Sequence, residues 1–144
     1  HVELALWTHD IIYNPRLSDN EKKSANWAAK CMHANGYSSH ACQAVTSLIM
    51  ATASHCAFDH DSALMTDIDL SILGRDSSSF KEYCCDIRQE FSFVDRTIYQ
   101  QARINVLKKF LERPYIYNSK PFQERFEKQA RHNLESEISQ LSIS

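Results

Sequence analysis

The scarcity of glycine and proline is the feature that most limits what this chain can fold into. Its 144 residues contain 2 Gly and 3 Pro. Sheets joined by tight hairpins usually need more of both residues at their turns. The sequence therefore predicts an all-α chain. Because this length suits one domain with its own core, we expect residues 1–144 to form a single helical domain.

Hydrophobic periodicity predicts a bundle of about seven helices. The expected helices cover residues 2–13, 18–35, 38–55, 63–74, 79–91, 95–111 and 119–141. Two of them begin at sequences typical of a capping box, in which Ser18 pairs with Glu21 and Ser79 pairs with Glu82.

Composition limits the partners and the compartment. The formal net charge of −2 argues neither for nor against a nucleic-acid partner. The sequence contains no motif that reads nucleic-acid bases, and we expect no such partner. The 5 cysteines form no Cys-x-x-Cys pair, and an odd number without metal-ligand spacing is typical of reduced thiols in the cytoplasm. With no apolar run long enough for a membrane span and no signal peptide, we expect a cytoplasmic protein that does not bind membranes.

The dipeptide His9-Asp10 lies in an apolar stretch, residues 2–13, that we expect to be helical. Apolar residues occupy every side of this helix, which predicts that it is buried. A buried Asp10 needs a partner, either in a salt bridge or hydrogen-bonded His-Asp pair or on a metal ion. Because adjacent helical residues point about 100° apart, His9 and Asp10 could both reach one cation beside the helix.

Two further carboxylates, Asp67 and Asp69, lie two residues apart and should therefore point to nearly opposite sides of their helix. Asp69 shares a side with Met65 and Ile72, so we expect it to face inward. One interpretation is that one aspartate is exposed and the other pairs with a basic residue. The other is that Asp69 joins His9 and Asp10 on a metal ion.

Several segments together resemble the HD-domain superfamily of metal-dependent phosphohydrolases. They are WTHDIIY at 7–13, DNEKKSA at 19–25, DIDLSILG at 67–74, and the stretches 103–117 and 122–134. The similarity is to small, predicted metal-dependent HD phosphohydrolases, and it covers essentially the whole chain. Each motif is short, and the specificity comes from their order and spacing.

The resemblance implies an HD-type helical bundle around one divalent ion, held by a His, then a His-Asp pair, then an Asp. His9 and Asp10 match the pair, and Asp69 matches the last ligand. The first histidine has no match, because His1 is too near His9 to come from a separate helix. We therefore expect that ligand on a helix upstream of residue 1, so that this chain lacks the first helix of the domain.

The implied activity is metal-dependent hydrolysis of a nucleotide or another small phosphorylated metabolite. Imidazole and carboxylate ligands suit Mn, Fe, Co, Ni or Zn. The ion would bind a phosphate oxygen and lower the pKa of a water that attacks phosphorus, with Asp10 helping to orient or deprotonate the water. The alternative is a non-catalytic helical scaffold or ligand-sensing protein with a vestigial or structural HD site, which the missing histidine favours.

Four more residues are candidates for the site. Glu21 is either a helix cap or, by resemblance, a catalytic proton donor or second-sphere partner facing the metal cleft. Asn20, from the same matching stretch as Glu21, is a weaker candidate for substrate binding. His55 at the end of the third expected helix is either a structural or surface residue or, because HD proteins often carry extra histidines near the metal, a residue that binds substrate phosphate or a second ion. Arg103 lies in the apolar stripe of the expected helix 95–111 and needs an anion. That anion is an interior carboxylate, which we favour, or a substrate phosphate.

Overall fold

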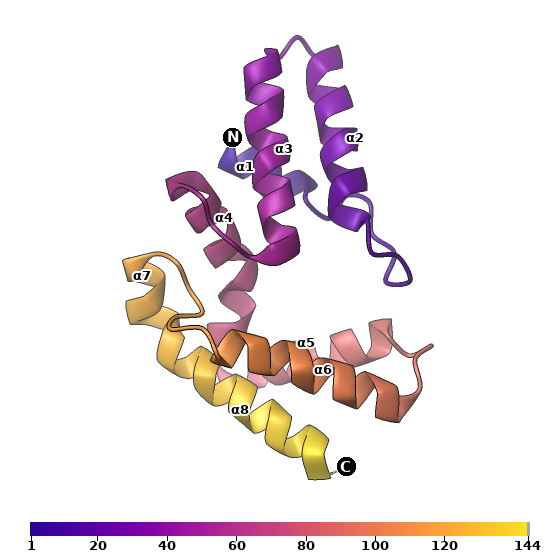
Figure 1. Ribbon diagram of the computed structural model, residues 1–144, viewed down its shortest axis with the longest axis vertical. Helices are drawn as coiled ribbons and strands as arrows, with labels where there is room; N and C mark the ends of the chain where they lie inside the picture. Colours follow the sequence, from indigo (N-terminus) through magenta and orange to yellow (C-terminus); the bar gives the residue numbers. More distant parts are fainter. Residues whose placement is uncertain (144) are drawn as a thin grey trace. The chain divides into compact units, whose positions relative to one another are not determined.

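The chain is all helical in the computed structural model, which describes residues 1–143 (Figure 1). The described residues contain helices and no strand, which confirms the all-α prediction. The helices form two compact units, His1–Asp69 and the part from Leu70 onward. The units are described separately below as unit 1 and unit 2.

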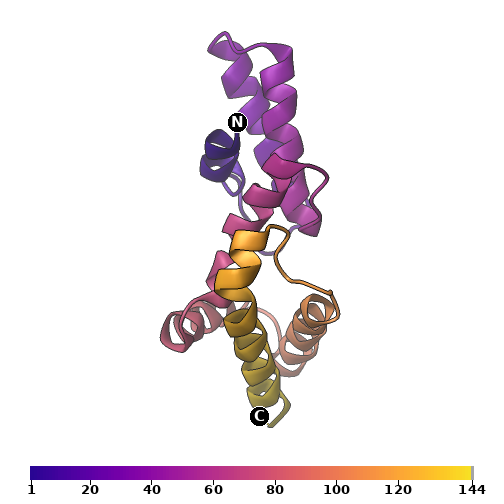
Figure 2. The same ribbon diagram turned by 90° about the vertical axis from the view of Figure 1, so that its left-hand side faces the viewer.

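Unit 1 is a small bundle built around one helical hairpin. Its elements are α1 (Val2–Thr8), α2 (Asn20–Ala34), α3 (Ser39–Ser54) and α4 (His60–Asp69). α2 and α3 lie side by side and run in opposite directions, and α1 and α4 pack against α3 and against each other (Figures 1 and 2). Small and aliphatic side chains form the core: Ala5, Ala25, Ala28, Met32, Cys42, Val45, Leu48, Ile49 and Met65.

The ends of the helical hairpin agree with the sequence signals. α2 ends before Asn35 and Gly36, and Gly36 has a φ of 79°, the left-handed conformation that glycine adopts without strain. α3 begins after Ser38, whose hydroxyl accepts a hydrogen bond from the Ala41 amide at 3.2 Å. α3 ends at Ser54, and its C-cap His55 also has a left-handed backbone.

The first helix is shorter than predicted. α1 ends at Thr8, with His9 as its C-cap, instead of continuing to Tyr13. The Ser24 hydroxyl of α2 accepts from the amide of Ile12 and donates to its carbonyl, both at 3.1 Å. Ser24 is fully buried. These bonds hold Ile12 against α2, so the chain leaves the helix before the predicted end.

The prediction that this first segment is buried on every side is wrong. Ala5 is fully buried, but Trp7 is 77% exposed, and Ile11 and Tyr13 are about half exposed. Only one face of the short helix packs against the rest of unit 1. Its apolar composition therefore does not translate into burial.

Both helices predicted to begin with a capping box begin elsewhere. α2 begins after Asp19, so Ser18 lies outside it. α5 (Ser77–Glu90) begins after Asp76, whose carboxylate accepts from the Ser79 amide at 3.0 Å and the Ser79 hydroxyl at 2.9 Å. Hydrogen bonds from Ser78 and Ser79 hold the pKa of Asp76 well below its usual range. The carboxylate of Asp76, three residues before the predicted cap Ser79, is a stronger hydrogen-bond acceptor than the Ser79 hydroxyl. The helix therefore begins after Asp76.

Unit 2 packs its helices around the last one. Its elements in chain order are the 3-10 helix η1 (Leu70–Gly74), α5, α6 (Arg96–Leu111), α7 (Lys120–Phe122), the π-helical segment η2 (Gln123–Glu127) and α8 (Lys128–Ile143). α8 packs against η1 and α6, and Figure 2 shows it running between α5 and α6. The core consists of Leu70, Leu73, Phe80, Leu107, Ile116, Tyr117, Ala130 and Leu134.

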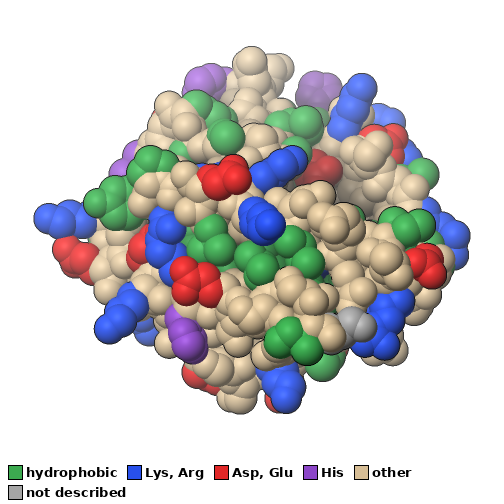
Figure 3. Space-filling model, turned by 60° about the horizontal axis from the view of Figure 1, so that its bottom comes forward, with side chains coloured by type: hydrophobic (Ala, Val, Ile, Leu, Met, Phe, Trp, Pro, Cys, Tyr) green, Lys and Arg blue, Asp and Glu red, His purple; other side chains and the backbone are tan. Residues whose placement is uncertain are grey.

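One face of the molecule shows no single dominant kind of side chain. The face drawn in Figure 3 mixes acidic and basic side chains around a group of apolar ones. All five cysteines of the described part of the chain are free. Within residues 1–143, none of the helices combines the length and hydropathy that a bilayer crossing requires.

Gly74→Ala is expected to destabilise unit 2 by about 1–3 kcal/mol, because overpacking a filled core costs roughly that much. A methyl group on Gly74 would lie 2.6 Å from Phe126 Cβ and 2.8 Å from the Tyr117 hydroxyl. Urea unfolding followed by circular dichroism measures the change. Gly36→Ala is the control, since its added Cβ meets no atom within 4 Å and only the left-handed backbone opposes it. Equal stability of Gly74→Ala and the parent would contradict the close packing at Gly74.

Candidate functional site

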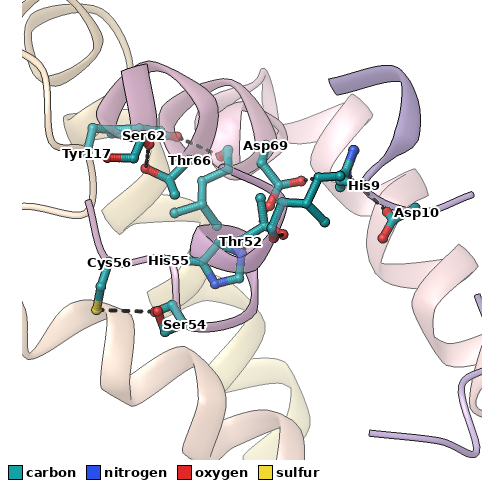
Figure 4. A network of polar contacts seen from close by, with 12 residues as sticks. His9, Asp10, Thr52, Ser54, His55, Cys56, Ser62, Thr66, Asp69 and Tyr117 are labelled. Atoms are coloured by element: carbon teal, nitrogen blue, oxygen red, sulfur yellow. Dashed lines mark hydrogen bonds and ion pairs between the residues drawn. The ribbon is translucent and has the colours of Figure 1, made fainter. Parts of the chain in front are cut away.

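Unit 1 brings His9, Asp10 and Asp69 together, as the resemblance implied. His9 Nε2 lies 3.2 Å from Asp10 Oδ2 and 3.3 Å from Asp69 Oδ1. Figure 4 shows the imidazole of His9 between the two carboxylates. Asp69 reaches it because α4, which ends at Asp69, packs against α1. Residues from the two ends of unit 1 thus form one cluster.

The ring of His9 is fixed by its other nitrogen. Nδ1 lies 2.8 Å from the backbone carbonyl oxygen of Leu6. A carbonyl oxygen only accepts hydrogen bonds, so Nδ1 is the donor. This leaves Nε2 directed at Asp10 and Asp69. Histidines that bind metals are commonly held in this way, with one ring nitrogen donating to a carbonyl and the other facing the ion.

The two carboxylates make His9 strongly basic. Hydrogen bonds to Asp10 and then to Asp69 raise the pKa of His9 to about 10, although burial acts in the opposite direction. Burial alone would raise the pKa of Asp69, but hydrogen bonds from His55 and His9 outweigh it and lower this pKa to about 2. At neutral pH the cluster is therefore a cationic imidazole between two carboxylates.

The two acidic partners of His9 differ in exposure. The side chain of Asp69 is 23% exposed, close to the 19% of His9, whereas that of Asp10 is 59% exposed. Asp10 follows the C-cap of α1 and lies outside the helix, so the predicted position of Asp10 inside a buried helix is wrong. Its carboxylate instead faces water on one side and His9 on the other.

The two aspartates of α4 differ as their spacing predicts. Asp69 faces His9, while Asp67, two residues earlier, is fully buried. The interpretation that one of the two aspartates is exposed is wrong. Asp67 belongs to the interior of unit 1, so replacing it would disturb the packing there.

His55 joins the cluster through Asp69. Its Nε2 lies 3.1 Å from Asp69 Oδ2, whereas His9 Nε2 lies 3.3 Å from Oδ1 of the same carboxylate (Figure 4). We predicted a role for His55 in binding substrate, and the structure places it against a predicted metal ligand.

Asn20 and Glu21, the two candidates at the start of α2, differ in burial. Asn20 is buried, and its amide binds the loop before it, donating to the carbonyls of Asn14 at 3.0 Å and Leu17 at 3.3 Å. Its Oδ1 accepts from the Asn14 amide at 3.0 Å. Asn20 therefore shapes the loop. Glu21 lies in the first turn of α2 and is partly exposed, and its catalytic role stays a prediction.

Arg103 pairs with an interior carboxylate in unit 2. Its Nε and Nη2 donate to the two carboxylate oxygens of Glu137 at 2.8 and 3.1 Å. The side chains are only 11% and 7% exposed. This is the salt bridge that we favoured from the sequence, and we assign Arg103 to the core of unit 2 and not to a substrate.

The second His-Asp dipeptide, His60-Asp61, is a useful contrast. Its side chains are 93% and 55% exposed and lie 3.7 Å apart. Asp59, just before it, accepts from the Ser62 amide at 2.8 Å and thereby caps α4. A His-Asp sequence alone thus does not make a cluster such as that around His9.

Sequence reasoning missed the groups that hold the site in shape. The Leu6 carbonyl orients His9, and Ser24 anchors the chain just after Asp10. A backbone carbonyl has no sequence signal. A serine on the apolar side of α2 could have been noticed, but its partner could not.

The donor groups form a chain of contacts, Asp10 to His9 to Asp69 to His55. Among the described residues, no three His, Cys, Asp or Glu side chains already surround one point as metal ligands do.

Comparisons of the sequence and structure with family models, curated proteins and solved structures gave no match. The histidine expected upstream of residue 1 lies outside this sequence and stays a prediction.

Proposed function

We propose that unit 1 contains a divalent-metal site that hydrolyses the phosphoester of a nucleotide or another small phosphorylated metabolite. The observation that supports this most is the arrangement of His9. Nδ1 is bound to the Leu6 carbonyl, and Nε2 faces two carboxylates at 3.2 and 3.3 Å. The free thiols of the chain fit a reducing compartment, and we propose the cytoplasm.

The donor set fits a first-row divalent ion. His9, Asp10 and Asp69 would hold it, and imidazole with carboxylates suits Mn, Fe, Co, Ni or Zn. His9 Nε2 lies 3.2 Å from Asp10 and 3.3 Å from Asp69, and these are hydrogen-bond contacts that a bound ion would replace. An ion bound here would supply a Lewis acid for the phosphoryl group and make a water molecule more acidic.

The residues of the chain have distinct tasks in this proposal. Asp10 is the more exposed carboxylate, so in this proposal it would orient a water molecule and accept its proton. Asp69, held on both oxygens, is the fixed carboxylate of the site. Glu21 is the candidate proton donor to the leaving group. A small phosphorylated molecule is the substrate class that this chemistry suits.

One observation favours a non-catalytic alternative. The cluster is satisfied without any ion, because His9 and His55 pair with Asp10 and Asp69. Such an ion-paired cluster could hold α1, α3 and α4 together in a scaffold or a ligand-sensing protein. The two functions predict different metal content and different turnover.

The test is to titrate the metal-free chain with Mn²⁺, Co²⁺, Ni²⁺ and Zn²⁺ by calorimetry and then assay phosphate release from a panel of phosphoesters. We expect one ion per chain, held by His9, Asp10 and Asp69 with water in the place of the histidine expected upstream. We also expect metal-dependent phosphate release, and loss of both in His9→Gln. Affinity should rise from pH 6 to pH 8, because the ion must displace a proton from His9, whose pKa is raised to about 10.

His60→Gln is the matched control, because His60 is also followed by Asp but is 93% exposed. It should bind metal and release phosphate like the parent. Stoichiometric metal with no hydrolysis of any phosphoester would favour the ligand-sensing alternative. Absence of metal binding in the parent would leave the cluster as a structural ion pair and overturn the proposed function.

A further inference from the structure

Asp69 is held on both of its carboxylate oxygens by imidazoles from different parts of unit 1. Oδ1 lies 3.3 Å from Nε2 of His9, at the end of α1. Oδ2 lies 3.1 Å from Nε2 of His55, which follows the last residue of α3. The carboxylate of an aspartate otherwise turns freely about its last bond, because that torsion has broad wells. Two contacts on opposite oxygens fix this rotation.

The backbone of His55 is in a conformation that most side chains avoid. Its φ of 51° and ψ of 38° are left-handed, and no other non-glycine residue in 1–143 has a positive φ. Glycine or asparagine usually occupies this position after a helix. Histidine adopts this conformation more often than most side chains but less readily than glycine. The contact with Asp69 is one that glycine could not make.

His9 and His55 contact different oxygens of Asp69, which gives them different roles. The carboxylate accepts hydrogen bonds, so His55 presents an Nε2–H to Oδ2. His9 contacts Asp10 and Oδ1, whereas His55 contacts Oδ2. His55 thus lies on the opposite oxygen of Asp69 from the proposed ligand atoms. Side chains in this position orient a metal-binding carboxylate without touching the ion.

We infer that His55 is a positioning residue, which holds Asp69 Oδ2 and thereby turns Oδ1 toward His9 and a bound divalent ion. This inference rests on the proposed metal site. It gives His55 a role other than the substrate binding that the sequence suggested. Removing such a partner typically weakens metal binding about 10–100-fold.

The test compares two amide variants that separate backbone from side-chain effects. Gln has its amide nitrogen the same number of bonds from Cβ as Nε2 of His, so His55→Gln can still donate to Asp69. Asn suits the left-handed backbone better but is one bond shorter, so His55→Asn should lose the contact. We expect Co²⁺ affinity to fall about 10–100-fold in His55→Asn and to return most of the way in His55→Gln.

The visible absorption spectrum of bound Co²⁺ is the second measurement, because it reports the ligands themselves. It should keep its band positions in both variants, since His55 is not a ligand in this inference. His60→Asn and His60→Gln are the controls at an exposed histidine and should bind Co²⁺ like the parent. Melting temperatures of the metal-free variants show whether folding alone explains a loss.

The other outcomes separate this inference from the proposed function. Parent-like affinity in His55→Asn would overturn the positioning role and leave the metal site standing. Equal losses in His55→Asn and His55→Gln with a changed Co²⁺ spectrum would make His55 a direct ligand, which also overturns it. A parent chain that binds no Co²⁺ would overturn the proposed function and this inference together.

Discussion

Replacing Asp69 with Asn is expected to abolish divalent-metal binding and phosphoester hydrolysis, whereas replacing Asp67 with Asn should keep both. Asn has nearly the shape of Asp but no charge. Asp69 is the carboxylate that faces His9 and His55, and those hydrogen bonds keep its pKa at about 2 despite burial. Loss of a direct ligand should weaken Co²⁺ binding more than the roughly 10–100-fold caused by loss of an outer partner.

Asp67→Asn is the stringent control because Asp67 is two residues away on α4 and fully buried. Both variants are expected to lose some stability, so the melting temperature of each metal-free protein is measured beside its Co²⁺ titration and its phosphate release. The assignment of Asp69 is wrong if the Asp67 variant loses the ion and the Asp69 variant retains it. Equal loss in both, in proteins that remain folded, would also contradict it.

Local signals predicted the parts of the fold that depend on neighbours in sequence. The scarcity of glycine and proline predicted the all-α class. Ser38 and Asp95 were predicted at helix starts, and both side chains accept hydrogen bonds from the first turn of their helices. A helix N-terminus needs a side-chain acceptor two or three residues before a backbone amide of the first turn. Both positions can be read from the sequence.

The errors arose where a distant group competes with a local one. Residues 2–13 have the apolar pattern of a longer helix, but Ser24 binds the backbone of Ile12, and the helix ends at Thr8. Trp7 is exposed because burial depends on what packs against α1, not on its composition. No periodicity identifies a hydroxyl on another helix as the competing partner.

The candidate site was predicted in part, and for a similar reason. Motif order placed His9, Asp10 and Asp69 in one cluster, and the structure brings them together. His55 was a weaker candidate, because its contact with Asp69 depends on how α3 ends and on where α4 packs. The anion for Arg103 was expected, but its identity as Glu137 required the packing of α6 against α8.

Breaking the Arg103–Glu137 pair is expected to have the largest effect on folding. Glu137→Leu should lower the free energy of unfolding by about 3–5 kcal/mol, because it leaves a buried guanidinium without its anion. Arg103 is 11% exposed and lies 5.5 Å from the centre of the Tyr83 ring, so little water can replace Glu137. Burial, with Glu137 close by, also raises the pKa of the neighbouring Cys84 thiol to about 12. Urea unfolding of the whole chain measures the change.

The double variant Arg103→Met/Glu137→Leu separates the cost of an unpaired charge from the value of the pair itself. It removes both charges and should recover most of the stability lost in Glu137→Leu, since replacing a whole buried pair by apolar groups is often neutral or stabilising. Glu124→Leu is the control, because Glu124 and Lys120 are 69% and 85% exposed and lie 4.0 Å apart. It should change stability by less than about 1 kcal/mol. If Glu137→Leu costs no more than Glu124→Leu, the guanidinium reaches water, and the pair is not the buried connection between α6 and α8 described above.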